Sequence, residues 1–319
     1  MDFKKIVLYN PAISSLNMGD HIIAEAAKDQ LSFMLNDAFT VEVSSHLPIS
    51  RMYMRHTKDF DYRFVCGSNL LRGKMNRLFR QWDIRLDQVD LVGESILVGT
   101  GWWQYGDDPN AYTKLLYNKI LSKNHIHSVR DNYTKQQLES IGITNVLNTA
   151  CPTMWKLTEE HCSKIDTHKK KNVVFTLTDY NRDEVNDLKL IEILCRNYEN
   201  VYYWIQGTKD FEYISSLIQS SLPVQFVAPT LKAYDHILDQ DDVEYIGTRL
   251  HGGIRALQKS RRAIIIGIDN RAVEKQKDFN ISVVNRSELD GLEELIHQPL
   301  SMDIRIPEKE ILEWKNQFK

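Results

Sequence analysis

The sequence lacks most of the patterns that mark a metalloprotein, a secreted disulfide protein or a membrane protein. It has only four cysteines in 319 residues, none in a CxxC spacing, so free and mostly buried thiols are expected. The ten histidines form no HExxH pattern, and no metal site is predicted. No apolar run approaches the ~20 residues that span a bilayer, and the N-terminus lacks a signal-peptide core.

Two common nucleotide-binding motifs are also missing. The chain contains neither the GxGxxG fingerprint nor the Walker GxxxxGK[ST] pattern, which argues against a NAD enzyme or a P-loop NTPase. A net charge of −3, from 40 basic and 43 acidic residues, argues against nucleic acid as a partner. The composition is that of an ordinary soluble globular protein. We therefore expect a cytoplasmic protein and leave peripheral contact with the inner face of the membrane open.

Short β runs alternate with amphipathic helices along nearly the whole chain, which is typical of α/β folds with parallel sheets. In the first half the predicted strands are Lys5–Tyr9, Phe39–Val43, Tyr62–Cys66, Ser95–Val98, His125–Val129 and Val146–Leu147. In the second half they are Val173–Leu177, Val201–Ile205, Val224–Val227, Val243–Ile246 and Ile264–Ile268. The pattern predicts two Rossmann-like domains facing across a cleft, at 1–160 and 173–298, with a lysine-rich linker at 161–172 and a helical tail at 299–319.

The most informative loop is Gly247–Gly253, between a predicted strand and the predicted helix Gly252–Gln258. In open α/β sheets, ligands bind beyond the carboxyl ends of strands, where helices begin. Arg249 and His251 are two positions apart and would point the same way in an extended segment. Arginine can clamp a carboxylate or phosphate, and histidine can move a proton near neutral pH. The alternative is an arginine paired with a carboxylate and a histidine that caps the helix. Gly252 and Gly253 allow close backbone approach beside the N–H groups of the helix start.

Other strand ends carry polar or aromatic residues that could contact a sugar. These loops contain Asn17, Gly19 and Asp20, then Gly67, Ser68 and Asn69, and finally Trp102 and Trp103. Each has a simpler reading as a turn, a helix cap (Asp20) or an aromatic that packs in the core. Arg130, Arg271 and Lys275 are cations near strand ends that would suit a doubly anionic small substrate, although each alone is more often a surface charge.

The segment from Gly247 to Ala256, with the later Asp269-Asn270-Arg271 turn, resembles the signature of the polysaccharide pyruvyl transferases. Asn17-x-Gly19-Asp20, Gly67-Ser68-Asn69 and Ser128-Val129-Arg130-Asp131 fit the resemblance in order. It implies a glycosyltransferase-B-like fold and transfer of a pyruvyl group from phosphoenolpyruvate to sugar hydroxyls. It further implies core roles for Arg249 and His251, with Arg130 also holding the donor. Arg271 stands where the family usually has lysine, and Thr149–Thr153 replaces a more common Asp-Pro.

On this resemblance we expect donor contacts from Arg130, Arg271, Gly252, Gly253 and Lys275, and acceptor contacts from the first domain. The acceptor is expected to be a sugar or lipid-linked saccharide of a cell-surface polysaccharide, and phosphoenolpyruvate would act as co-substrate without a further cofactor. Two alternatives stay open: a nucleotide-sugar glycosyltransferase on the same fold, and a non-catalytic carbohydrate-binding protein.

Overall fold

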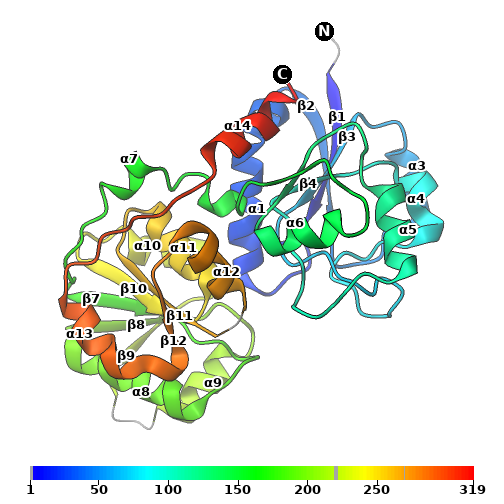
Figure 1. Ribbon diagram of the computed structural model, residues 1–319. Helices are drawn as coiled ribbons and strands as arrows, with labels where there is room; N and C mark the ends of the chain where they lie inside the picture. The colour runs from blue at the N-terminus through cyan, green and yellow to red at the C-terminus, as the bar shows by residue number, and fades with distance from the viewer. Residues whose placement is uncertain (1–2, 219–221, 269) are drawn as a thin grey trace. The chain divides into compact units, whose positions relative to one another are not determined.

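The structure, a computed structural model, describes residues 3–218, 222–268 and 270–319. Its contacts divide the chain into two units, each built on a mainly parallel sheet (Figure 1). Unit 1 comprises Met1–Ser15, Ile23–Trp155 and Ile306–Lys319, and unit 2 comprises Leu16–Ile22 and Lys156–Arg305. Two short segments therefore pack with the unit that is distant from them in sequence.

The sheet of unit 1 is parallel, in the order β2-β1-β3-β4. A parallel pair, β5-β6, continues it through an isolated bridge between Thr100 and Val129. The strands are β1 (Lys4–Asn10), β2 (Ala38–Ser44), β3 (Tyr62–Cys66), β4 (Ile96–Val98), β5 (His127–Val129) and β6 (Val146–Asn148). Because the strand order reverses between β1 and β3, the fold rule places a ligand crevice outside the carboxyl ends of these two strands.

Helices pack on the sheet of unit 1 and close its apolar core. The C-terminal helix is part of this unit, since the ring of Trp314 packs against Phe64 and Trp155. Side-chain caps begin several helices, as when the Asn110 side chain accepts from the N–H of Thr113. The helical segments are α1 (Met18–Gln30), α2 (Ser32–Leu35), α3 (Arg51–His56), η1 (Leu86–Gln88), α4 (Val89–Val92), α5 (Ala111–Ile120), α6 (Asn132–Glu139), η2 (Pro152–Met154) and α14 (Glu308–Asn316).

Unit 2 has a six-stranded parallel sheet in the order β12-β11-β10-β7-β8-β9. The strands are β7 (Asn172–Phe175), β8 (Asn200–Trp204), β9 (Val224–Val227), β10 (Val243–Gly247), β11 (Ala263–Gly267) and β12 (Val283–Asn285). Numbered within the unit, this is the 3-2-1-4-5-6 order of the doubly wound nucleotide-binding fold. The direction of winding changes between β7 and β10, which defines the expected ligand crevice.

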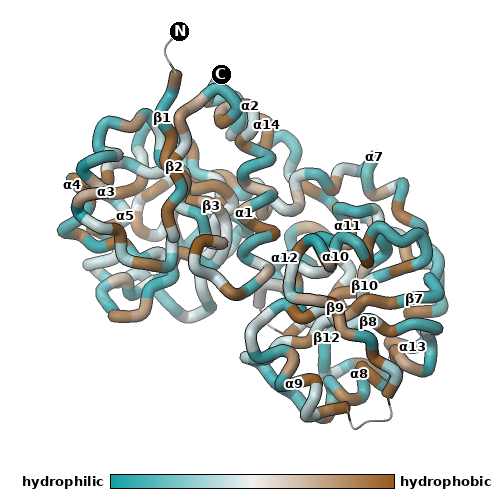
Figure 2. The backbone as a smooth tube through the Cα atoms, turned by 180° about the vertical axis from the view of Figure 1, so that it is seen from behind, coloured by the Kyte–Doolittle hydropathy of each residue, from teal (hydrophilic) through white to brown (hydrophobic). Residues whose placement is uncertain are grey.

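Helices cover both faces of this sheet (Figure 1), and the apolar strand residues, brown in Figure 2, form the core between them. Helices α8, α9 and α13 bury their apolar sides against one face, while α10 and α11 pack on the other, where Trp204 stacks on Tyr234. The helical segments are α7 (Glu159–Cys162), α8 (Glu184–Asn197), α9 (Asp210–Leu217), α10 (Leu231–Leu238), α11 (Leu250–Gln258), α12 (Asn270–Phe279), η3 (Arg286–Gly291) and α13 (Leu292–His297).

Two of the differences between the structure and the sequence-based elements concern unit 2. β12 was not predicted, because Val283 and Val284 are its only apolar residues and it lies at the sheet edge. The predicted lysine-rich linker is attached to unit 2: the N–H of Lys170 donates to Glu244 and that of Lys171 to Asp242. All four cysteines are free, as expected. Among the described residues, no helix is both long and apolar enough to cross a membrane.

Candidate active site

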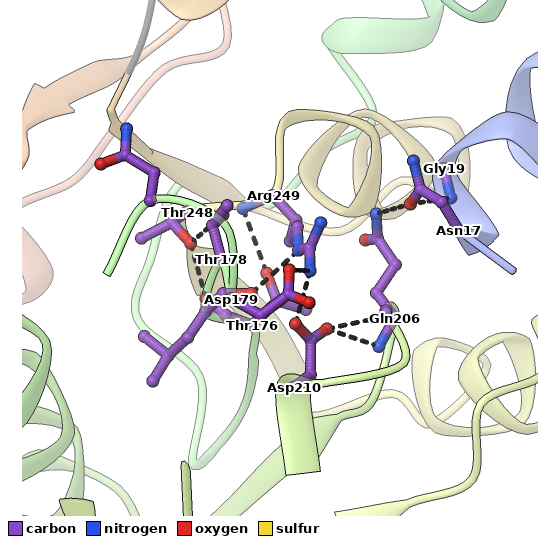
Figure 3. Close-up of polar contacts among 12 residues, drawn as sticks. Asn17, Gly19, Thr176, Thr178, Asp179, Gln206, Asp210, Thr248 and Arg249 are labelled. Atoms are coloured by element: carbon purple, nitrogen blue, oxygen red, sulfur yellow. Dashed lines mark hydrogen bonds and ion pairs between the residues drawn. The ribbon is translucent and has the colours of Figure 1, made fainter. Parts of the chain in front are cut away.

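The carboxyl ends of β7, β8 and β10 bring a polar cluster together at the crevice of unit 2 (Figure 3). The ends of β7 and β10 lie very close, since the N–H of Thr248 donates to the carbonyl of Thr176 at 2.9 Å. A Cβ on Gly247 would come within 2.7 Å of the Thr176 nitrogen, so glycine is needed there. The hydroxyls of Thr178 and Thr248 pair at 2.8 Å. These contacts fix the backbone from which Arg249 extends.

Arg249 lies at the centre of the cluster and is only 4% exposed. Its Nε donates to the carbonyl of Leu177 at 2.9 Å. Its Nη2 donates to the carboxylate of Asp179 at 2.8 Å and also to that of Asp210 (Figure 3). Nη1 has no hydrogen-bond partner among the described residues. It is also not fully buried, so solvent can reach it. One nitrogen of a fixed guanidinium is therefore open to a ligand.

Asp210 is the fully buried partner that holds this arginine in place. Its second carboxylate oxygen accepts from the N–H groups of Gln206, at 3.0 Å, and Gly207, at 2.7 Å. A Cβ on Gly207 would lie 2.7 Å from Nη2 of Arg249, so the missing side chain allows the close approach. Asp210 thus ties the end of β8 to the loop after β10.

The neighbouring carboxylates keep Arg249 charged although it is almost fully buried. Burial alone would lower its pKa, but the carboxylates of Asp210 and Asp179, together with the phenol of Tyr180, raise it above the ordinary value. Burial raises the pKa of the Asp210 carboxyl, and Arg249 and the Gly207 N–H act against that shift. With Asp179 only 13% exposed at its side chain, two carboxylates compete for one cation.

Helix α11 begins at Leu250, two residues earlier than the sequence pattern predicted, with Arg249 as its N-cap residue. His251 lies in the first helical turn and is buried, so the argument from an extended segment does not apply to the Arg249–His251 pair. The side chain of Arg249, the N-cap residue, makes no capping hydrogen bond to this helix.

Gly252 and Gly253 serve helix packing. A Cβ on Gly253 would come within 2.8 Å of Ile265, and one on Gly252 within 3.1 Å of the Tyr245 hydroxyl. The carbonyl of Gly252 accepts from the Tyr234 hydroxyl at 2.8 Å. The close approach predicted for these glycines is thus made to the sheet and to neighbouring side chains.

The Asn17–Asp20 segment belongs to unit 2 by its contacts. The side chain of Asn17 caps α1 by accepting from the Gly19 N–H at 3.1 Å; Asp20 lies inside the helix and is not the cap, contrary to the simpler reading of the sequence. The same Asn17 oxygen accepts from Nε2 of Gln206 at 3.2 Å (Figure 3). The Met18 N–H donates to the Gln206 carbonyl. The start of α1 therefore adjoins the polar cluster through one glutamine.

The other predicted donor residues of unit 2 lie on α12. The side chain of Lys275 is only 2% exposed, and its ammonium lies 5.6 Å from the ring centre of Phe279, so it is not the surface cation that the sequence suggested. Arg271 lies in the first turn of the same helix. Asp269, in the predicted basic turn, lies outside the described residues.

Arg130 belongs to unit 1, where every guanidinium nitrogen has a protein acceptor. Nε donates to Asp131 at 2.8 Å, Nη2 donates to the carbonyl of Trp102 at 3.1 Å, and Nη1 donates to the side chain of Asn69. A Cβ on Gly101 would lie 2.0 Å from Nε. In this arrangement Arg130 holds three loops together and offers no unpaired nitrogen to a phosphate.

The predicted acceptor loops of unit 1 form tight turns after β3 and β4. Gly67 and Ser68 both have φ near +58°, an unusual conformation for a serine. Trp102 is 1% exposed and donates through Nε1 to the Asp107 carbonyl, so it offers no face to a sugar ring. Trp103 is half-buried, with the Arg72 guanidinium 4.6 Å from its ring centre.

Sequence reasoning missed Asp179, Gln206 and Asp210. Each follows a strand that had been predicted, so the strand-end rule that selected Arg249 also covers them. An isolated acid or amide after a strand or at the start of a helix has no motif that would single it out. The pairing of Asp210 with a cation 39 positions later exists only in three dimensions.

Two Rossmann-like units with polar sites at strand ends define a glycosyltransferase-B type of fold. The chain is similar to a UDP-GlcNAc 2-epimerase of Methanocaldococcus jannaschii, at 11% identity and a TM-score of 0.57, over 100% of this chain and 99% of that one. A putative UDP-N-acetylglucosamine 2-epimerase of Listeria monocytogenes has 10% sequence identity and a TM-score of 0.57, over 100% of this chain and 95% of that one. The E. coli heptosyltransferase WaaC has 11% sequence identity and a TM-score of 0.44, over 91% of this chain and 97% of that one. The first two confirm the predicted fold class.

The polysaccharide pyruvyl transferase family model matches residues 17–270, and the chain belongs to that family. The predicted resemblance is thereby confirmed, and the family is one of transferases. The matched range includes both Asn17 and Arg249. A comparison with curated proteins found no match.

Proposed function

We propose that this protein transfers a pyruvyl group from phosphoenolpyruvate to hydroxyls of a sugar, within a cell-surface polysaccharide or its lipid- or nucleotide-linked precursor. Membership of the family supports the reaction class. One observation supports the donor: Nη1 of Arg249 has no hydrogen-bond partner among the described residues, and Arg249 stands at the N-terminus of α11.

Phosphoenolpyruvate carries a phosphate and a carboxylate, and both groups suit this place. The N-terminus of α11 carries a partial positive charge that favours an anion, and the guanidinium adds a directed, always-charged donor. The carboxylate of Asp179 already accepts from Nη2, at 2.8 Å, and it would repel an incoming anion. We therefore expect the donor to displace or reorient Asp179, whereas buried Asp210 keeps its place.

His251, in the first turn of α11, is the proposed acid–base group. In the overall reaction, C3 of phosphoenolpyruvate gains a proton and becomes a methyl group. Two sugar oxygens bond to C2, the C2–O bond to phosphate breaks, and phosphate leaves. One of the two hydroxyl protons is thus taken up at C3, and the other leaves with phosphate. Arg249 and the helix N–H groups would stabilise the departing phosphate.

The deciding experiment is phosphate release from phosphoenolpyruvate in the presence of an acceptor saccharide. The proposal expects release in the wild type, loss in His251→Ala and an unchanged circular dichroism spectrum. Full activity of His251→Ala would contradict the role of the histidine. If the wild type does not bind phosphoenolpyruvate, the assignment of phosphoenolpyruvate as the donor is wrong.

One observation favours a nucleotide-sugar donor as the second candidate. Oε1 of Gln206 is buried, lies near α11 and has no hydrogen-bond donor among the described residues. Phosphoenolpyruvate has no N–H group to offer it, whereas a nucleotide base does. Thermal stabilisation by a nucleoside diphosphate but not by phosphoenolpyruvate would favour this candidate, and Gln206→Leu would then lower the nucleotide effect.

A further inference from the structure

A long irregular segment of unit 1, residues 67–85, connects β3 to η1. Loops of this length without secondary structure are uncommon in compact domains and are usually functional. This one is anchored in the core by fully buried side chains: Leu70, Leu71, Met75, Trp82 and Ile84. These buried side chains hold the loop in one conformation and fix the position of its exposed part.

The tip of this loop exposes two large apolar side chains in succession. Leu78 is 98% exposed and Phe79 is 59% exposed. The Phe79 ring lies 5.9 Å from that of half-buried Trp103, so the apolar surface continues onto a second loop. Single exposed apolar residues are common, but Leu78 exposes a larger fraction than any other large apolar side chain in the described part of the chain.

Polar contacts hold the tip in this exposed position. Arg72 donates to the carbonyl of Phe79, and Arg80 donates to the Arg77 carbonyl at 2.7 Å and to Asp83 at 2.7 Å. The side chain of Asn110 donates to that of Asn76 at 2.8 Å. These contacts hold the backbone carbonyls of Arg77 and Phe79, on either side of Leu78.

The segment that carries the tip is basic, although the whole chain carries −3 and the exposed Asp108 lies beside Gly73. Between positions 72 and 80 there are four basic residues and no acidic one: Arg72, Lys74, Arg77 and Arg80. Asp107 lies 3.8 Å from Arg72, and Asp83 pairs with Arg80. Lys74 and Arg77 form no ion pair with any described residue and remain available to anions.

We propose that this tip, defined as Lys74, Arg77, Leu78, Phe79 and Trp103, binds the surface of an anionic lipid bilayer. Leu78 and Phe79 would enter the boundary between headgroups and acyl chains, where tryptophan is also favoured. Lys74 and Arg77 would face anionic headgroups. A sugar is less suited, because Arg72 covers the Trp103 ring and Leu78 has no polar group.

Two apolar side chains and two cations predict weak and reversible attachment, which suits an enzyme that must meet a lipid-linked substrate at a membrane. The inference does not depend on which group the protein transfers. It is carried by the exposure and charge of the tip, so it stands even if the donor proposed above is wrong.

The test is sedimentation of the full chain with vesicles of phosphatidylcholine alone or of equal parts phosphatidylcholine and phosphatidylglycerol. We expect binding to the mixed vesicles, weakened by added salt, and little binding to the neutral ones. The double variant Leu78→Ser/Phe79→Ser should bind about tenfold more weakly, because serine removes most of the apolar surface that the tip would bury in the bilayer. Lys74→Gln/Arg77→Gln should remove the preference for the anionic vesicles.

Val185→Ser, at a 78% exposed position on α8 of unit 2, is the matched apolar control and should bind like the wild type. All variants change exposed or half-exposed side chains. Thermal unfolding of each variant, compared with the wild type, checks that it is folded. Equal binding by the wild type and the Leu78/Phe79 variant would overturn the proposal, as would wild-type binding that ignores the lipid charge. So would a variant that binds vesicles normally but loses affinity for a soluble saccharide, which would identify an acceptor site.

Discussion

The guanidinium of Arg249 donates to the carboxylate of Asp210 inside unit 2, although 39 positions separate them in the sequence. Both side chains are buried, and Asp210 is itself held by the N–H groups of Gln206 and Gly207. The pair therefore determines where the charge of Arg249 lies and which of its nitrogens remains open.

Asp210→Asn should destabilise unit 2 and misplace Arg249. Removing one partner of a buried ion pair typically costs about 3–5 kcal/mol, because the other charge stays buried and uncompensated. We expect a lower urea midpoint and a loss of phosphoenolpyruvate binding, measured by denaturation and calorimetry. Unchanged stability would show that the pair contributes little.

Asp179→Asn should have the opposite effect on binding. This carboxylate competes with an anion for Arg249, and Asp210 still pairs with the arginine when the Asp179 charge is removed. The substitution should therefore tighten phosphoenolpyruvate binding several-fold and should cost less stability than Asp210→Asn. Asp290→Asn, at a side chain that is 91% exposed, serves as the charge-matched control. Weaker binding by the Asp179 variant would indicate that this carboxylate helps to hold the donor.

Gly207→Ala tests the position of Arg249 without changing any charge. The new Cβ would lie 2.7 Å from Nη2, so the end of the arginine must shift. A displacement of this kind should lower kcat/KM for pyruvyl transfer about tenfold or more, with a small effect on stability. Gly291→Ala is the control, since a Cβ there meets no atom within 4 Å. If both variants retain full activity, the exact position of Arg249 does not matter.

A buried histidine in unit 1 should make stability depend on pH. Burial lowers the pKa of His127 to about 4, from an ordinary value of 6.5, and its Nδ1 accepts from the Leu97 N–H in the neutral form. Because the folded-state pKa is depressed, the stabilisation is complete above about pH 6.5 and is lost as the pH falls toward 4. The loss amounts to about 3 kcal/mol.

The check is the free energy of unfolding in urea, measured between pH 7.5 and about 4.5 for the wild type and His127→Gln. The variant should be less stable at neutral pH and should show a shallower decline on acidification. Parallel curves for the two proteins would mean that other groups cause the acid sensitivity.

The position of Arg249 in the site could be predicted, and its environment could not. The apolar run of β10 followed by glycine and arginine indicates a strand end, and strand ends of parallel sheets meet ligands. Which carboxylates lie beside that arginine depends on the lateral order of β7, β8 and β10, because hydrogen bonds between strands distant in sequence set this order. Burial likewise depends on contacts between distant segments, so the sequence predicts a sugar contact for Trp102 although the folded chain buries it.

The sequence by itself determined the alternation of strands and helices, the family signature and the loop that carries Arg249 and His251. These are local properties, since periodicity and a short motif are contained in adjacent residues. Tertiary structure alone decided that Asp210 and Asp179 share Arg249, that Asn17 joins unit 2, and that Trp314 packs in unit 1. Each is a contact between distant segments, and its energy comes from burial and pairing that no single segment contains.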